Sequence, residues 1–130
     1  MKNKLTPAIF LDRDGTINYD RNYLSDVKQL KLYRNIEKPL LKFRDMGFKI
    51  VIVTNQSGIA RKYFTVTKLK QINSKLIEML KKLKVKVDGM YYCPHGPNDN
   101  CECRKPKIGM ALKAAKELKI DLKKSYMIGD

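Results

Sequence analysis

The sequence predicts an α/β fold, in which a Rossmann-like, three-layer arrangement surrounds a parallel β-sheet. Short apolar segments rich in β-branched residues alternate along the chain with longer segments of helical period, as is typical of parallel sheets. Polar clusters follow three of the apolar segments directly, where α/β proteins bind their ligands. The length of 130 residues fits one domain with a modest core.

The first half of the chain predicts two strands and one helix. Residues 8–11 are apolar and predict a short buried strand, whereas residues 15–34 hold no steady period and predict an irregular excursion. A helix is expected from Asn35, as its N-cap, to a stop at Gly47, because the apolar residues between them keep helical spacing. Residues 48–54 are mostly β-branched and predict a central strand covered on both faces.

The second half predicts two more helices and two more strands. Residues 64–67 lead into a long helix, and residues 108–118 predict a shorter one. The strands are expected at residues 87–93 and 125–128. The apolar stripes of the two helices, which we expect in the core, consist of Leu69, Ile72, Leu76, Leu80 and Leu83 in the first and Met110, Ala114, Ala115 and Leu118 in the second.

The predicted fourth strand ends at the last residues of the sequence. Because a sheet of this kind normally continues, we expect residues 1–130 to form a single domain that lacks its C-terminal part. An exposed sheet edge and apolar surface would then favour association, so the full-length protein is expected to be a monomer and this chain to associate through that edge. An inactive fragment, or one that a partner completes, is the alternative.

The composition carries a net charge of +15, which raises the question of nucleic-acid binding. The excess is mostly lysine, with 22 Lys against 6 Arg, and base readout depends more on arginine. We therefore interpret the charge as a lysine-rich surface that also attracts anionic substrates, with no nucleic-acid partner expected. No apolar run reaches membrane length and no signal peptide precedes residue 8, so a cytoplasmic protein is expected.

All three cysteines and the only histidine of the chain fall within eleven residues, as Cys93, His95, Cys101 and Cys103. Three thiolates and one imidazole are a complete ligand set for tetrahedral Zn²⁺. Three cysteines cannot all form disulfides within one chain, and a cytoplasmic protein seldom forms them. With all four positions filled by protein, the zinc is expected to be structural.

Acidic and polar residues stand at the carboxyl ends of three predicted strands. These are Asp12 and Asp14 after the first, residues 54–57 after the second and Asp130 after the fourth, and a parallel sheet brings such positions to one crevice. Carboxylates so close repel one another unless a cation lies between them. Their oxygen ligands favour Mg²⁺ beside a phosphate group, so the sequence predicts a site for a phosphorylated substrate.

Each of these residues has a chemical task in such a site. Asp12 is placed to attack phosphorus and form an aspartyl-phosphate intermediate. Asp14 could protonate the leaving alkoxide and later activate water. Thr54 offers a hydroxyl group and backbone N–H groups to the phosphate oxygens, and Lys105 supplies positive charge that offsets the nucleophile and the phosphoryl group.

The same motifs resemble those of a known superfamily. Residues 12–16 (Asp-Arg-Asp-Gly-Thr), 53–58, 104–106 and 129–130 resemble the four motifs of the haloacid dehalogenase superfamily of phosphotransferases. Within it, the zinc loop and residues 54–61 (Thr-Asn-Gln-Ser-Gly-Ile-Ala-Arg) are similar to the heptose 1,7-bisphosphate 7-phosphatase family. The five residues between His95 and Cys101 also resemble the histidinol-phosphate phosphatase branch, whereas residues 57–61 favour the heptose family.

This resemblance implies a haloacid dehalogenase-type fold and a Mg²⁺-dependent phosphatase that removes the 7-phosphate of heptose 1,7-bisphosphate in ADP- or GDP-heptose biosynthesis. It implies that Asp12, Asp14 through its carbonyl group and Asp130 hold the Mg²⁺ ion. The zinc loop would fold over the site. The residues that would contact the sugar bisphosphate are Asp20, Arg21, Asn22, Tyr23, Asn55, Gln56, Ser57 and Arg104.

Two alternatives to this function remain at this point. Histidinol phosphate or another small phosphate ester is the first. A nucleic-acid-binding zinc module is the second, motivated by the charge and the Cys/His cluster, although no arginine-rich helix follows that cluster.

Overall fold

The computed structural model describes residues 4–20, 24–56, 58–95, 101, 105 and 109–129. Its strands are β1 (Ala8–Leu11), β2 (Lys49–Asn55), β3 (Gly89–Cys93) and β4 (Tyr126–Ile128). They form one parallel sheet in the order β3-β2-β1-β4. Its α-helices are α1 (Glu37–Asp45), α2 (Val66–Lys82) and α3 (Gly109–Leu118), with 3₁₀ turns η1 (Val27–Gln29) and η2 (Leu122–Lys124).

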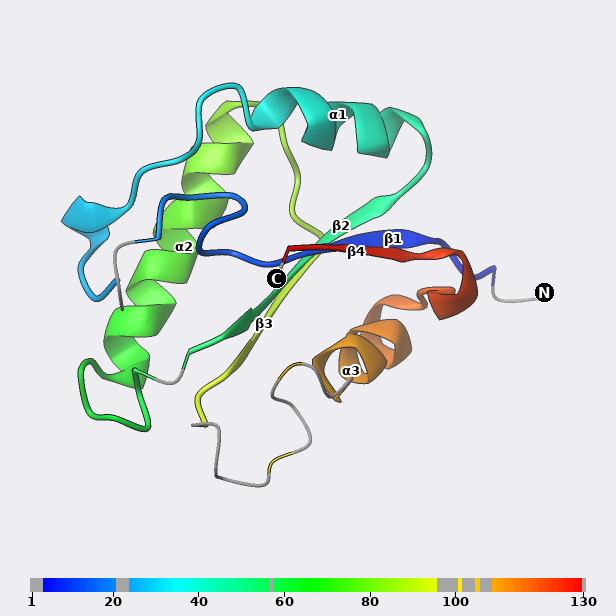
Figure 1. Cartoon of the computed structure of the whole chain (residues 1–130). Helices are drawn as coiled ribbons and strands as arrows, with labels where there is room; N and C mark the ends of the chain where they lie inside the picture. The colour runs from blue at the N-terminus through cyan, green and yellow to red at the C-terminus, as the bar shows by residue number, and fades with distance from the viewer. Residues whose placement is uncertain are drawn as a thin grey trace.

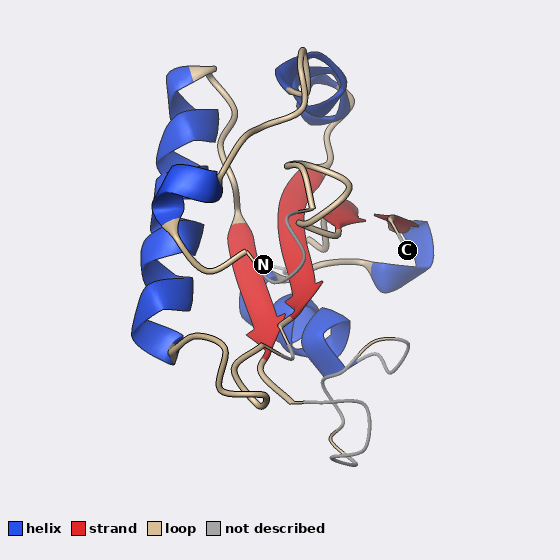
Figure 2. Ribbon diagram, turned by 60° about the vertical axis from the view of Figure 1, so that its left-hand side comes forward, coloured by secondary structure: helices blue, strands red, loops and turns tan. Residues whose placement is uncertain are grey.

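The helices cover both faces of the sheet, as the predicted three-layer fold requires (Figures 1 and 2). Alternate side chains of β1 and β2 face opposite layers, because successive residues of a strand point to opposite sides. Ile9, Leu11, Ile50 and Ile52 pack in the cluster that includes Leu40 of α1 and Ile72, Leu76 and Leu80 of α2, whereas Ala8, Phe10, Val51 and Val53 pack in the cluster that includes Met110 and Ala114 of α3. The prediction of a central strand buried on both faces is confirmed.

The predicted start of α1 is wrong by one residue and in its chemistry. Asn35 has a φ of +62°, in the left-handed region that asparagine tolerates, and the N-cap position falls on Ile36, which has no side-chain cap. The predicted stop is confirmed, since Gly47 has a φ of +96° and directly follows the C-cap residue Met46.

The apolar stripe of α2 ends earlier than its sequence period predicts. Leu69, Ile72, Leu76 and Leu80 are buried, but Leu83 is 37% exposed. The helix stops at Lys82, and Lys84 turns the chain with a φ of +70°. Val85 then donates its N–H to the Leu80 carbonyl at 2.9 Å. Its side chain is buried in the core, where Leu83 was expected to lie.

The strand β4 forms one edge of the described sheet and is the most exposed of its strands. Tyr126, Met127 and Ile128 are 63%, 47% and 37% exposed, so its pairing with β1 is its main contact with the fold. Such an apolar edge is where association with another chain would begin. No helix among the described residues is long and apolar enough to cross a membrane.

Candidate active site

The carboxyl ends of β1, β2 and β4 meet at one edge of the sheet. Leu11, the last residue of β1, pairs with Ile52 of β2 and with Ile128 of β4. The next residue, Asp12, donates its N–H to the Ile128 carbonyl at 3.0 Å. The structure therefore brings together the ends of all three strands that carry the predicted site, up to Gly129.

Lys105 reaches this edge and pairs with Asp12. Its Nζ atom lies 2.9 Å from Oδ1 of Asp12, and it also donates to the Val53 carbonyl at 3.2 Å. The Arg13 N–H donates to the same Asp12 oxygen at 2.9 Å. The Asp12 and Lys105 side chains are each 17% exposed, so the pair is sheltered but open to a small ligand.

Asn55 holds the backbone of Lys105. Its Oδ1 accepts from the Lys105 N–H at 2.9 Å, and its Nδ2 donates to the Lys105 carbonyl at 3.4 Å. The side chain at the end of β2 thus fixes the residue that pairs with Asp12. Its predicted contact with substrate stays a prediction.

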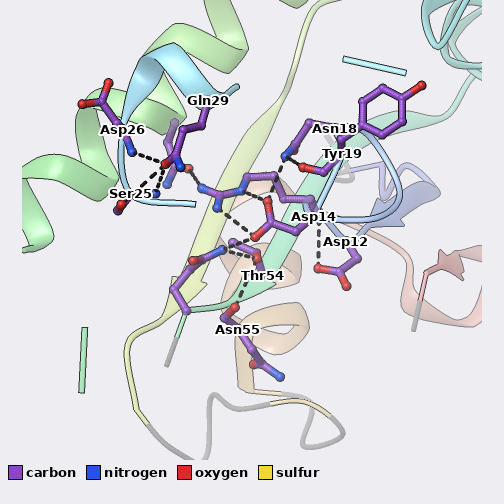
Figure 3. A network of polar contacts seen from close by, with 12 residues as sticks. Asp12, Asp14, Asn18, Tyr19, Ser25, Asp26, Gln29, Thr54 and Asn55 are labelled. Carbon is purple, nitrogen blue, oxygen red and sulfur yellow. Dashed lines mark hydrogen bonds and ion pairs between the residues drawn. The ribbon is translucent and has the colours of Figure 1, made fainter. Parts of the chain in front are cut away.

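Asp14 accepts four hydrogen bonds from three buried side chains, which is close to the capacity of a carboxylate. Its Oδ1 accepts from Nε of Arg13 at 3.0 Å and from Nδ2 of Asn18 at 2.9 Å. Its Oδ2 accepts from Nη2 of Arg13 at 2.9 Å and from Nε2 of Gln56 at 3.3 Å. Figure 3 shows Asp14 within this network, between Asn18 and Thr54.

These donors set the charge state of Asp14. Burial raises the pKa of its carboxyl group, but the hydrogen bond and positive charge of Arg13, with hydrogen bonds from Asn18 and Gln56, lower the pKa further than burial raises it. The net pKa lies below the ordinary value for aspartate, so Asp14 is a carboxylate at neutral pH when no substrate is bound.

Gln56 connects Asp14 to the predicted phosphate-binding residue. Its Nε2 atom donates to the hydroxyl oxygen of Thr54 at 2.7 Å as well as to Asp14. Both residues are almost fully buried, with 1% of Thr54 and 4% of Gln56 exposed. The predicted cluster at the end of β2 therefore contacts the acidic turn after β1.

Sequence reasoning missed Arg13 and Asn18 as parts of this site. Both are fully buried, at 0% exposure, and both donate to Asp14. An arginine between two aspartates in a turn is expected at the surface. Here a hydrogen bond to Asn73 of α2, 60 residues further along the chain, fixes the direction of the Arg13 side chain. The only signal was Asn73 itself, a polar residue beside Ile72 within an apolar stripe.

Gly129 lets β4 end against Asp12. It has a φ of +130°, and a Cβ atom added there would lie 2.6 Å from Cβ of Asp12 and 3.0 Å from the Thr16 hydroxyl oxygen.

We expect the Gly129→Ala substitution to displace Asp12 and to lower kcat by roughly 10- to 100-fold. Gly47→Ala, which is also strained but meets no atom within 4 Å, is the control and is expected to keep kcat. Equal kcat in the Gly129→Ala variant and the parent would contradict this reading.

A second cluster lies where β3 ends. The ligand atoms of Cys93, His95 and Cys101 lie within 4.8 Å of one another. Sγ of Cys93 is 3.6 Å from Nδ1 of His95 and 3.4 Å from Sγ of Cys101. Ligands of a tetrahedral zinc ion stand about 3.5–3.8 Å apart, given metal bonds of about 2.0–2.3 Å, so these donors fit Zn²⁺.

The remaining predicted residues divide into two groups. Asp20 is described and exposed. Seven lie outside the described residues: Arg21, Asn22, Tyr23, Ser57, Cys103, Arg104 and Asp130.

A family comparison covers nearly the whole chain. The family model described as polynucleotide kinase 3 phosphatase matches residues 8–130. That span begins at the first residue of β1 and ends at Asp130, so the match includes the carboxyl ends of all the strands described above.

Similar proteins and structures carry a more specific name. The D-glycero-beta-D-manno-heptose-1,7-bisphosphate 7-phosphatase of Helicobacter pylori is 46% identical over 124 residues, which are 95% of this chain and 71% of that protein. The protein of the same name from Haemophilus influenzae is 44% identical over 132 residues, covering 97% of this chain and 72% of its own length. The crystal structure of D,D-heptose 1,7-bisphosphate phosphatase from B. bronchiseptica, complexed with magnesium and phosphate, superposes with a TM-score of 0.85 at 33% identity, over 95% of this chain and 70% of that one.

Proposed function

Because the chain belongs to the haloacid dehalogenase-type family of heptose 1,7-bisphosphate 7-phosphatases, we propose that it hydrolyses the 7-phosphate of D-glycero-D-manno-heptose 1,7-bisphosphate. The observation that carries the mechanism is the pair of Asp12 and Lys105, 2.9 Å apart at the meeting point of three strand ends. A carboxylate beside a fixed cation is what attack on an anionic phosphoryl group requires.

The first step forms a covalent intermediate on Asp12. A carboxylate oxygen of Asp12 attacks phosphorus, the bond from phosphorus to the sugar oxygen breaks, and its electron pair leaves with that oxygen. Lys105 offsets the charge of the attacking carboxylate and of the phosphoryl oxygens, while Thr54 donates its hydroxyl hydrogen to one of them. Water then cleaves the aspartyl phosphate and restores Asp12.

Asp14 moves the proton in both steps. A phosphate bound beside Asp14 places a second negative charge near it, which favours its protonated form, so Asp14 takes up a proton as the substrate binds. It gives that proton to the departing sugar oxygen and then accepts one from the attacking water. The contact with Gln56, at 3.3 Å the longest of the four, is the one that yields to make room for the proton.

Asp12, the carbonyl group of Asp14 and Asp130 would hold a Mg²⁺ ion, as their hard oxygen ligands suit it. The similar structure from B. bronchiseptica was solved with magnesium and phosphate. The bound ion would supply positive charge that lets Asp12 and a phosphate group approach each other. The residues proposed to hold the sugar are Asp20, Arg21, Asn22, Tyr23, Asn55, Gln56, Ser57 and Arg104.

A structural Zn²⁺ ion is proposed to shape the segment leading to Lys105. Its ligands would be Cys93, His95, Cys101 and Cys103. We expect about one zinc ion per chain, and loss of the zinc together with a lower Tm in Cys93→Ser, since the ion's binding energy adds to folding energy. Metal analysis and thermal unfolding measure both, with Tyr92→Phe on the same strand as control. Zinc-free protein with the parent's Tm and activity would contradict this role.

The chain is proposed to act in the cytoplasm on a small phosphorylated sugar, as one domain that is a monomer in the full-length protein and that can associate through the exposed edge at β4. A reducing compartment keeps the thiols of the proposed zinc site available.

A panel of phosphate esters with Mg²⁺ tests the substrate. We expect the highest kcat/KM for heptose 1,7-bisphosphate, with loss of the 7-phosphate, and much lower values for histidinol phosphate and for an oligonucleotide 3′-phosphate. A preference for histidinol phosphate would move the chain to that neighbouring branch. A preference for the oligonucleotide would agree instead with the name of the matching family model and with the net charge of +15.

A further inference from the structure

The Arg13 side chain bridges α2 and the acidic turn after β1, an arrangement called here the Arg13 clamp. Its Nε and Nη2 atoms donate to the two different oxygens of Asp14, at 3.0 and 2.9 Å. Its third nitrogen, Nη1, donates to Oδ1 of Asn73 at 2.8 Å. The guanidinium group is planar and rigid, so these three bonds fix the plane of the Asp14 carboxylate relative to α2.

The burial of this clamp shows that it is more than a surface ion pair. Arg13 is 0% exposed and Asn73 is 8% exposed. Asn73 stands next to Ile72 and three residues before Leu76, on the face of α2 that packs in the core. A polar group and a charge at such positions cost free energy unless they are bonded, and a hydrophobic pair there is often as stable. Fold stability alone therefore does not require this pair.

We propose that Asn73 and Arg13 are positioning residues that hold Asp14 in line with the leaving oxygen of the substrate. This inference rests on the proposed phosphatase function. Nη2 of Arg13 and Nε2 of Gln56 both donate to Oδ2, and Gln56 also donates to the Thr54 hydroxyl oxygen, so Oδ2 is the carboxylate oxygen that is linked to the proposed phosphate-binding residue. The proton on Oδ2 passes to the sugar oxygen while the phosphorus–oxygen bond breaks and the Asp12–phosphorus bond forms.

The leaving group separates this role from a general structural one. A sugar alkoxide leaves only with a proton, whereas nitrophenolate leaves without one, so only the sugar ester depends on the aim of Asp14 in the first step. The experiment measures the first turnover by rapid mixing, with the full chain and Mg²⁺. It compares release of sugar from a sugar phosphate with the burst of nitrophenolate from p-nitrophenyl phosphate.

We expect Asn73→Ala to slow the first turnover of the sugar phosphate by about 10- to 100-fold and that of the aryl ester by less than about 3-fold. Asn73→Asp keeps an acceptor oxygen for Arg13 and is expected to restore most of the sugar-phosphate rate. Arg13→Lys keeps the charge but loses the two-pronged contact, so it should slow the sugar phosphate selectively as well. Ile72→Val, which removes one methylene from the same core face, controls for packing and should slow neither ester.

Equal slowing of both esters by Asn73→Ala, or the same slowing by Ile72→Val, would overturn the inference while the proposed function stands. Should Asn73→Ala fail to fold, as judged by circular dichroism, Arg13→Lys decides the question by the same comparison. A parent chain that hydrolyses neither ester would overturn the proposed function, and this inference with it.

Discussion

Replacing Asp12 by asparagine is expected to abolish phosphatase turnover, with kcat lower by about 10⁴-fold or more. An amide of nearly the same shape cannot attack phosphorus, so the covalent step is lost with little change in the volume of the side chain. The zinc content should not change, because Asp12 is not among the ligand atoms gathered at Cys93, His95 and Cys101. Steady-state hydrolysis of the preferred ester and metal analysis on the same sample measure both quantities.

The control for this variant is Asp45→Asn, which removes an exposed carboxylate at the end of α1. It should keep the activity of the parent. Asp12→Asn protein that retains more than about a tenth of the parent's kcat, with correct folding, would refute Asp12 as the nucleophile.

Replacing Lys105 by methionine is expected to lower kcat by about 10²- to 10³-fold. Among the described residues, Lys105 is the one cation that forms an ion pair with Asp12, with Nζ 2.9 Å from Oδ1. Without it, the Asp12 carboxylate and the incoming phosphoryl group repel each other more strongly, because the ion pair that offsets the charge of Asp12 is lost. Methionine keeps much of the volume of the lysine stem, and the bonds of the Lys105 backbone to Asn55 do not depend on its side chain.

Lys70→Met on α2 is the matched control, since it removes the same charge from an exposed side chain that is not among the site residues. It tests whether general attraction by a chain of net charge +15 accounts for the effect. A similar fall in activity in both variants would assign the effect to the overall field and would remove Lys105 from the mechanism.

The fold and the convergence of its strand ends could be predicted from the sequence, since alternating strands and helices leave few arrangements. The clustering of Cys93, His95 and Cys101 was predictable because these residues lie close together in the chain. The start of α1 was not, because Asn35 could serve either as a cap or in a left-handed turn, and local sequence does not decide between them. Leu83 keeps the period of α2, but the chain turns at Lys84 before that period can place it in the core.

The proximity of Asp12, Asp14 and Lys105 was predicted from the sequence, but the residues that hold them were not. Arg13 turns inward because Asn73 accepts from it across 60 positions of sequence, and no local pattern records that contact. The contact of Asn55 with the Lys105 backbone likewise joins residues 50 positions apart. Such supporting contacts are tertiary, so they appear only when the whole chain is packed.

Trapping the reaction intermediate tests the central claim most directly. The full chain is mixed with its preferred ester and Mg²⁺, quenched within one turnover, treated with borohydride to reduce any acyl phosphate, and digested for mass spectrometry. The account predicts that the peptide containing Asp12, and no other, carries the reduced side chain, and that Asp12→Asn yields none. Rapid hydrolysis with reduction at no aspartate, or at Asp14 instead, would contradict it.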